Sequence, residues 1–286
     1  MRSSQPAHHV APEGLLPVGE RPPLHRYVAQ VLARARFMWA LANAQLRSTY
    51  GRDRLGALWL TLTPLLNALT YYLIFGVLLN TQNGIDNFIG FLIVGVFLYQ
   101  FSASAITEGS RVIRNNQRLV QTLSFPRAVL PVSLVLRTVL ALAPALLVMF
   151  VLVLAIPPHA PLTWRWLMVV PGLLLQVAFT LGVVLVLARL VAKVNDISNM
   201  LQFALRTWMY FSGIFYSFET FVAHPTVLTI LELNPMHAFL TIARDALLYD
   251  RVADSGTWLV ATGWSIPLLV IGLVVFWQAE EEYARA

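Results

Sequence analysis

Three arginines, Arg111, Arg114 and Arg118, recur at intervals of three and four residues, which places them on one face of a short helix. Apolar residues alternate with them, and these can anchor the opposite face of the same helix. The pattern predicts a short basic helix that projects from the protein and docks on a partner. The alternative is ordinary loop charge, which explains the sign of these residues but not their spacing.

Catalytic and nucleotide-binding patterns are missing from the sequence. No glycine-rich loop ends in Lys-Ser or Lys-Thr, no HExxH motif occurs, and the chain has no cysteine. Of the six histidines only His8 and His9 adjoin, and no histidine and carboxylate cluster suggests a metal site. We therefore expect no enzyme. Transport by this chain would need an ion gradient, a passive pore or a separate motor subunit.

Composition indicates an all-α integral membrane protein. The 286 residues are 58% hydrophobic and only 12% charged, and the mean hydropathy is +0.67. Soluble domains carry about twice that share of charge, and a bilayer-crossing helix needs about 20 apolar residues. Six apolar runs meet this requirement: residues 55–79, 88–107, 129–156, 167–191, 200–218 and 258–277.

The loop charges orient these six transmembrane helices. Fifteen Lys and Arg residues fall on one side of the predicted spans and three on the other. The positive-inside rule therefore places both termini in the cytoplasm. This asymmetry also accounts for the net charge of +6, so no nucleic-acid partner is expected.

We expect the chain to consist of four regions. Residues 1–24 hold five prolines and predict a disordered tail, whereas residues 25–50 predict an amphipathic helix in the membrane interface. The alternative for the latter is a cytosolic helix packed on a partner. Residues 51–279 form the permease domain, and residues 280–286 a cytoplasmic tail. Within the permease domain, residues 221–248 predict short re-entrant or interfacial helices before the last span.

Charged and aromatic residues inside the spans suggest two further features. Arg137 and Arg206 either snorkel or pair with Glu108 or Asp196, or they take part in the transport path. Carboxylates are missing from the middle of the spans, which argues against an ion-coupled carrier. Aromatic residues either pack between helices or line a pore over which sugar rings slide; the candidates are Tyr71, Tyr72, Phe75, Trp208, Phe211 and Phe215.

Three stretches in order resemble a known family. They are STYGRDRLGALWLTLTPLL (48–66), FPRAVLPVS (125–133) and ELNPMHAFLTIARDALL (232–248). Together with an interfacial helix and six spans, they are similar to the permease subunits of ABC-type exporters of cell-surface polysaccharides. That family exports O-antigen, capsule and teichoic acid.

The resemblance implies a function and a set of partners. It implies a homodimer of this chain with two copies of a separate ABC ATPase, in the cytoplasmic membrane of a bacterium. The ATPase would bind ATP and Mg, and no cofactor is expected on this chain. The cargo would be a polyprenyl-diphosphate-linked glycan. The alternative cargo is a drug or a small lipid.

The resemblance also implies roles for particular residues. Residues 110–123 would form the coupling helix, with Arg111, Arg114, Gln117 and Arg118 against the ATPase. The lipid diphosphate would meet Arg47, Arg52 and Arg54, since arginine pairs well with phosphate oxygens. The alternative is that Arg52 and Arg54 only anchor the first span at the cytoplasmic surface of the membrane. An outer gate would include Asn234, Pro235 and Arg244. Membrane lipids would surround the whole domain.

Overall fold

The computed structural model describes residues 22–50, 56–79, 85–122, 125–157, 159–218 and 224–281, and all regular elements within these ranges are helical. Five helical stretches are long and apolar enough to cross a bilayer, and each matches a predicted span to within a few residues. They are α3 (Trp59–Tyr71) with the π-helix Tyr72–Leu78, α4 (Phe88–Ser110), α7 (Val129–Ala155), the 3₁₀ helix Trp164–Met168 with α8 (Val169–Lys193), and α13 (Ser255–Gln278).

The prediction of a continuous fifth span over residues 200–218 is wrong. Helix α9 (Ile197–Tyr210) has 14 residues, or about 21 Å, whereas a bilayer core is about 30 Å thick. The chain then turns at Gly213, whose φ of +64° is a conformation that glycine adopts without strain. Apolar composition hides this break, because the residues of the turn are as apolar as those of the helix.

The segment before the last span forms two short helices, α11 (Pro225–Glu232) and α12 (Pro235–Leu247), whose axes differ by 82°. The break falls where Pro235 begins α12, since proline fits the first turn of a helix but disrupts its interior. The side chain of Asn234 caps α12 by accepting a hydrogen bond from Met236 N at 3.0 Å. The described residues thus contain five spans, or six if the bent pair counts as one.

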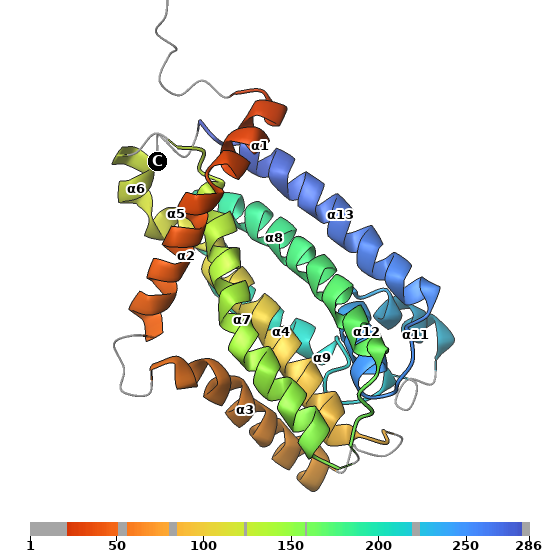
Figure 1. Ribbon diagram of the computed structural model, residues 1–286. Coiled ribbons are helices and arrows are strands. Elements are labelled where there is room, and N and C mark those ends of the chain that lie inside the picture. The colour runs from red at the N-terminus through yellow and green to blue at the C-terminus, as the bar shows by residue number, and fades with distance from the viewer. Residues whose placement is uncertain are drawn as a thin grey trace, which may run out of the picture.

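Helix α4 lies at the centre of the bundle and contacts α3, α7, α8, α9 and α12 (Figure 1). Within its most apolar window 78% of the residues are buried, compared with 17% for the window in α3. Helices α8 and α13 approach each other at two glycines. A Cβ on Gly182 would lie 2.6 Å from the Leu268 carbonyl, and one on Gly272 would lie 2.5 Å from the Gly182 oxygen.

Helices α1 (Leu24–Ala33), α2 (Ala35–Tyr50), α5 (Val112–Asn115) and α6 (Gln117–Thr122) gather where α13 ends, and α11 and α12 lie at the opposite end (Figure 1). We call the former the basic end, because it carries Arg26, Arg34, Arg36, Arg47, Arg111, Arg114, Arg118 and Arg127. The single helix predicted over residues 25–50 is interrupted at Arg34. Tyr27, Val31 and Met38 pack inward, while Trp39 remains half exposed.

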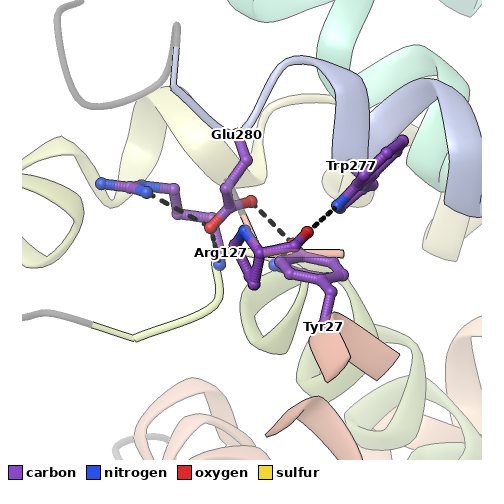
Figure 2. A network of polar contacts seen from close by, with 6 residues as sticks. Tyr27, Arg127, Trp277 and Glu280 are labelled. Atoms are coloured by element: carbon purple, nitrogen blue, oxygen red, sulfur yellow. Dashed lines mark hydrogen bonds and ion pairs between the residues drawn. The ribbon is translucent and has the colours of Figure 1, made fainter. Parts of the chain in front are cut away.

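A buried carboxylate ties α1 to the ends of α7 and α13 (Figure 2). Glu280 accepts hydrogen bonds from the Tyr27 hydroxyl (2.6 Å), the Arg127 backbone N–H (2.8 Å) and the Arg127 guanidinium (3.2 Å). The Tyr27 oxygen in turn accepts from Ala128 N at 3.1 Å. Trp277 Nε1 donates to the Pro22 carbonyl at 2.8 Å. Burial raises the pKa of Glu280, and the bonds from Tyr27 and Arg127 oppose that rise.

Candidate functional site

The open face of α4 is polar. Between Phe91 and Ser110 all residues are buried except five, of which four are polar: Gln100, Ala103, Ser104, Thr107 and Glu108. Their spacing of three and four residues places them along one side of the helix. Polar side chains facing lipid are costly, and within membrane proteins they face a bundle interior or a water-filled passage.

Two hollows lie along this face of α4, and the larger one holds most of its polar side chains. One of about 500 Å³ lies between α3, α4 and α9, and another of about 180 Å³ lies between α3, α4 and α7. Asn67 Nδ2 on α3 donates to Gln100 Oε1 at 3.0 Å, which joins the two helices across the surface. We call this surface the polar groove and define it by Asn67, Gln100, Ser104, Thr107, Glu108, Gln202 and Arg206.

Arg137 and Arg206, the two arginines that the sequence places within predicted spans, both lie near the groove. They differ in whether a carboxylate pairs with them. Arg137 on α7 forms an ion pair with Glu108, which is one of the alternatives that the sequence predicts. Arg206 on α9 is exposed and lines the larger hollow. Within the described residues Arg206 has no ion pair with a carboxylate. Its guanidinium therefore adds positive charge to the groove.

The predicted pore aromatics divide into packed and exposed groups. Phe215 is fully buried, stacked on Phe75 at 4.4 Å between ring centroids and edge-on to Tyr71 at 4.8 Å. Trp208 packs on Tyr99 and Phe179, and Tyr72 is half-buried beside the same core. Phe211 is exposed. In this conformation most of the set joins α3 to the turn after α9.

The predicted outer-gate residues hold that same turn in place. Asn234 Nδ2 donates to the Phe211 carbonyl at 2.8 Å, and Asn234 Oδ1 accepts from Trp208 Nε1 at 3.0 Å. Arg244 is buried, and its guanidinium donates to three backbone carbonyls: those of Phe91 (3.1 Å), Gly213 (2.9 Å) and Ile214 (3.3 Å). It also lies over the Phe91 ring. Helix α12 thereby fixes the end of α9 against α4.

The predicted docking segment consists of two short helices separated at Asn116. Val112, Ile113 and Val120 are buried against the basic end, while Arg114, Gln117 and Arg118 are exposed. Arg111 instead turns back, and its guanidinium donates to the Ser198 carbonyl at 3.4 Å. The three arginines therefore do not share one surface, and the exposed surface is formed by Arg114, Gln117 and Arg118.

Arg47 is exposed in the last turn of α2. The other two arginines predicted to meet a diphosphate, Arg52 and Arg54, lie outside the described residues. The sequence reasoning missed Asn67, Gln100, Ser104 and Gln202, because each is a single polar residue in an apolar run. The signal that could have revealed Gln100 and Ser104 is the recurrence of polar residues from Gln100 to Glu108.

Residues 36–248 match the family described as ABC-2 type transporter. A protein of Myxococcus xanthus named O-antigen export system permease protein RfbA is 27% identical over 248 residues, which cover 86% of this chain and 94% of that protein. A Klebsiella pneumoniae protein of the same name is 28% identical over 252 residues, covering 86% and 92%.

Proposed function

The chain belongs to the ABC-2 type transporter family, and from that premise we propose that it is the membrane-spanning subunit of an ATP-driven polysaccharide exporter. The cargo is a polyprenyl-diphosphate-linked polymer of the O-antigen, capsule or teichoic acid class. Relatives named as O-antigen export permeases align with 86% of this chain and support that choice. The observation that carries the proposal is the polar groove, a hydrophilic surface along the central helix of a membrane domain.

The groove suits a hydrated polymer better than an apolar drug. Amide, hydroxyl, carboxylate and guanidinium groups line it, and these can exchange hydrogen bonds with sugar hydroxyls while the polymer moves. It lies between α3 and α9 on the outside of α4, and α3 is poorly buried within this chain. We propose that a second copy of the chain covers this side, so that the path runs between two permeases.

A separate ATPase supplies the energy in this proposal. Two copies bind ATP and Mg and dock on the basic end, which faces the bacterial cytoplasm together with both termini. Arg114, Gln117 and Arg118 form the docking surface, since they are exposed on helices whose other face is anchored by Val112, Ile113 and Val120. Helices α1 and α2 lie in the inner interface, where Arg47, Arg52 and Arg54 meet the diphosphate.

The opposite end forms the outer gate. Trp264 Nε1 donates a hydrogen bond to the Leu233 carbonyl at 2.9 Å. Trp264 lies about 13 Å along the helix axis from Ser255, the first residue of α13. Gln176 Nε2 within α8 lies 3.9 Å from Met236 Sδ. These contacts support a re-entrant α11–α12 pair that dips into the bilayer and meets α9 from the outer side. The two parts together complete the sixth crossing.

Depletion of this protein in its host tests the proposal. We expect a long polyprenyl-linked polymer to accumulate inside the cell while the surface polymer disappears, as measured by extraction and sizing of lipid-linked glycans. A complementing gene with Arg114 and Arg118 changed to Glu is expected to insert normally and fail to restore export. Intact surface glycans without accumulation would instead indicate a permease for a drug or a small lipid.

A further inference from the structure

A hollow of about 310 Å³ lies at the basic end of the polar groove, where the last turn of α2 meets α4, α5 and α7. Three charged side chains line it, Arg111, Arg137 and Glu108, and its other polar groups are neutral. We call it the arginine pocket. Two positive charges against one negative charge give it a net attraction for an anion.

The guanidinium groups of the arginine pocket retain donors for a ligand. An arginine offers five N–H donors in a planar fork. Among the described residues, the Arg111 guanidinium makes one long bond to the Ser198 carbonyl, and Arg137 bonds to Glu108. Gln45 also lines the pocket, and the NH2 group of its amide is a further donor. The pocket therefore offers more hydrogen-bonding groups than its own residues use.

The two partners of the ion pair differ in exposure. The side chain of Glu108 is 50% exposed, whereas that of Arg137 is 15% exposed. The carboxylate is therefore on the open side of the pair, and the guanidinium forms part of the wall. Glu108 can leave Arg137 and become solvated, whereas Arg137 stays in place. An anion with several oxygens can then take the position of the carboxylate.

An apolar hollow adjoins the arginine pocket at this ion pair. Glu108 and Arg137 also line the 180 Å³ hollow between α3, α4 and α7. The rest of that wall is mainly hydrocarbon and aromatic, and includes Trp59, Pro64, Phe97 and Leu142. A ligand bound at Arg137 thus has charge complementarity on one side and an apolar surface on the other. This combination fits an amphiphile with an anionic head and a hydrocarbon chain.

We propose that the arginine pocket binds the phosphate group of a lipid headgroup, and that Glu108 occupies Arg137 while the pocket is empty. The phosphate oxygens replace the Glu108 carboxylate on Arg137 and reach Arg111, while the hydrocarbon chain follows the apolar hollow. No covalent bond is made or broken. The inference rests on the proposed function, because a headgroup bound here lies at the mouth of the polar groove. The phosphate belongs either to a bilayer phospholipid or to the polyprenyl carrier of a glycan.

Lipid binding to the purified full chain in a neutral detergent tests the pocket. Undecaprenyl diphosphate and phosphatidylglycerol are titrated separately, and bound lipid is counted by native mass spectrometry. Tighter binding of the first identifies the carrier lipid as the ligand, and tighter binding of the second identifies the bilayer phospholipid. Either result supports the pocket if it depends on Arg137.

Variants distinguish a ligand site from a structural ion pair. Arg137→Gln is expected to weaken binding of the preferred lipid roughly tenfold or more, since hydrogen bonds to charged groups are lost. Glu108→Gln is expected to bind at least as tightly as wild type, because the competing carboxylate is gone. Arg36→Gln, which removes an exposed arginine of α2 outside the pocket, is the matched control and should bind as wild type does.

Equal loss of binding in Glu108→Gln and Arg137→Gln would overturn the proposal, because a structural pair depends on both partners. Binding of neither lipid by folded wild-type protein would also overturn it. If Arg137→Gln does not fold, Arg111→Gln replaces it with the same expectation. Export is not measured in this experiment. A failure of the pocket therefore leaves the depletion result intact, and a failure of the exporter proposal appears only in the depletion result.

Discussion

Arg244 shows how a buried charge can serve structure inside a membrane protein. Within the described residues, its guanidinium has backbone carbonyls as hydrogen-bond acceptors, and they come from α4 and from the turn after α9. The adjacent carboxylate, Asp245, pairs instead with Arg251 at 2.7 Å. The planar fork of arginine reaches two carbonyls of the irregular turn and one of α4 at the same time, and so joins the turn to that helix.

Replacing Arg244 with Met should destabilise the protein by about 3–5 kcal/mol, because the buried turn carbonyls of Gly213 and Ile214 lose this donor. Equilibrium unfolding in mild detergent, followed by tryptophan fluorescence, measures the loss. Arg206→Met is the control: the same substitution at an exposed arginine should change stability by less than about 0.5 kcal/mol. An equally small loss of stability at the two sites would contradict this prediction, because it would show that other donors satisfy the carbonyls.

At the scale of elements, the contact between α8 and α13 depends on small residues. Association of helices in a bilayer relies on close van der Waals packing, and glycine lets the backbones approach. The Cβ positions of Gly182 and Gly272 both point at backbone atoms of the facing helix, which cannot move aside as a flexible side chain can.

Gly182→Ala should therefore separate α8 from α13 and lower stability by about 1–3 kcal/mol, as overpacking does in other interiors. Gly263→Ala is a matched control on α13, since nothing lies within 4 Å of its Cβ position. That substitution should be neutral or slightly stabilising, because alanine is the better helix former. The order of the two unfolding midpoints checks the prediction, and coinciding midpoints would contradict it.

The attachment of α1 should depend on pH through Glu280. Burial raises the pKa of this carboxyl, so the folded protein holds its proton more tightly than the unfolded chain. The attachment should therefore strengthen as pH falls through the raised pKa towards 4.5, the ordinary value, and weaken as pH rises through the raised pKa.

Hydrogen exchange of the α1 amides, corrected for the intrinsic pH dependence of exchange, measures this attachment. In Glu280→Gln the protection should no longer vary with pH over the same interval, because glutamine does not titrate; its single oxygen can still accept from Arg127, whereas its NH2 group cannot accept from Tyr27. Protection of wild-type α1 that falls on acidification would contradict the assignment.

At the scale of the whole molecule, the spans that end at charges or prolines were predictable, and those that end at a turn were not. Helices α4, α7, α8 and α13 begin and end near their predicted bounds, because charge and polarity change there. The end of α9 depends on Gly213 and on capture of carbonyls by Arg244, thirty-one residues away along the chain from Gly213. The amino-acid composition around α9 does not reveal a contact with a residue so distant in the sequence.

The candidate site was only partly predictable for a similar reason. Pairing of Arg137 with Glu108 follows from two opposite charges near one membrane surface, and the sequence offered it as an alternative. To predict the groove, one must know that other helices cover the rest of α4. Only then does the remaining strip of Gln100, Ser104, Thr107 and Glu108 stand out as the open side.

The groove should be accessible to water in the assembled protein. The chain has no cysteine, so single cysteines can be introduced without background labelling. Ser104→Cys in the groove should react with a membrane-impermeant thiol reagent in opened vesicles, whereas Leu147→Cys, exposed on α7, should not if it faces lipid. Labelling of Leu147→Cys alone would place the aqueous passage elsewhere.

The junction at Glu280 has a consequence for biosynthesis. Tyr27 and Glu280 are separated by 253 residues, so α1 leaves the ribosome long before its partner exists. While the spans are inserted, the Tyr27 hydroxyl cannot yet donate to Glu280, and the Pro22 carbonyl cannot yet accept the hydrogen bond from Trp277. Closure of the basic end therefore follows the synthesis of α13, and it marks a polypeptide that has been translated through that helix.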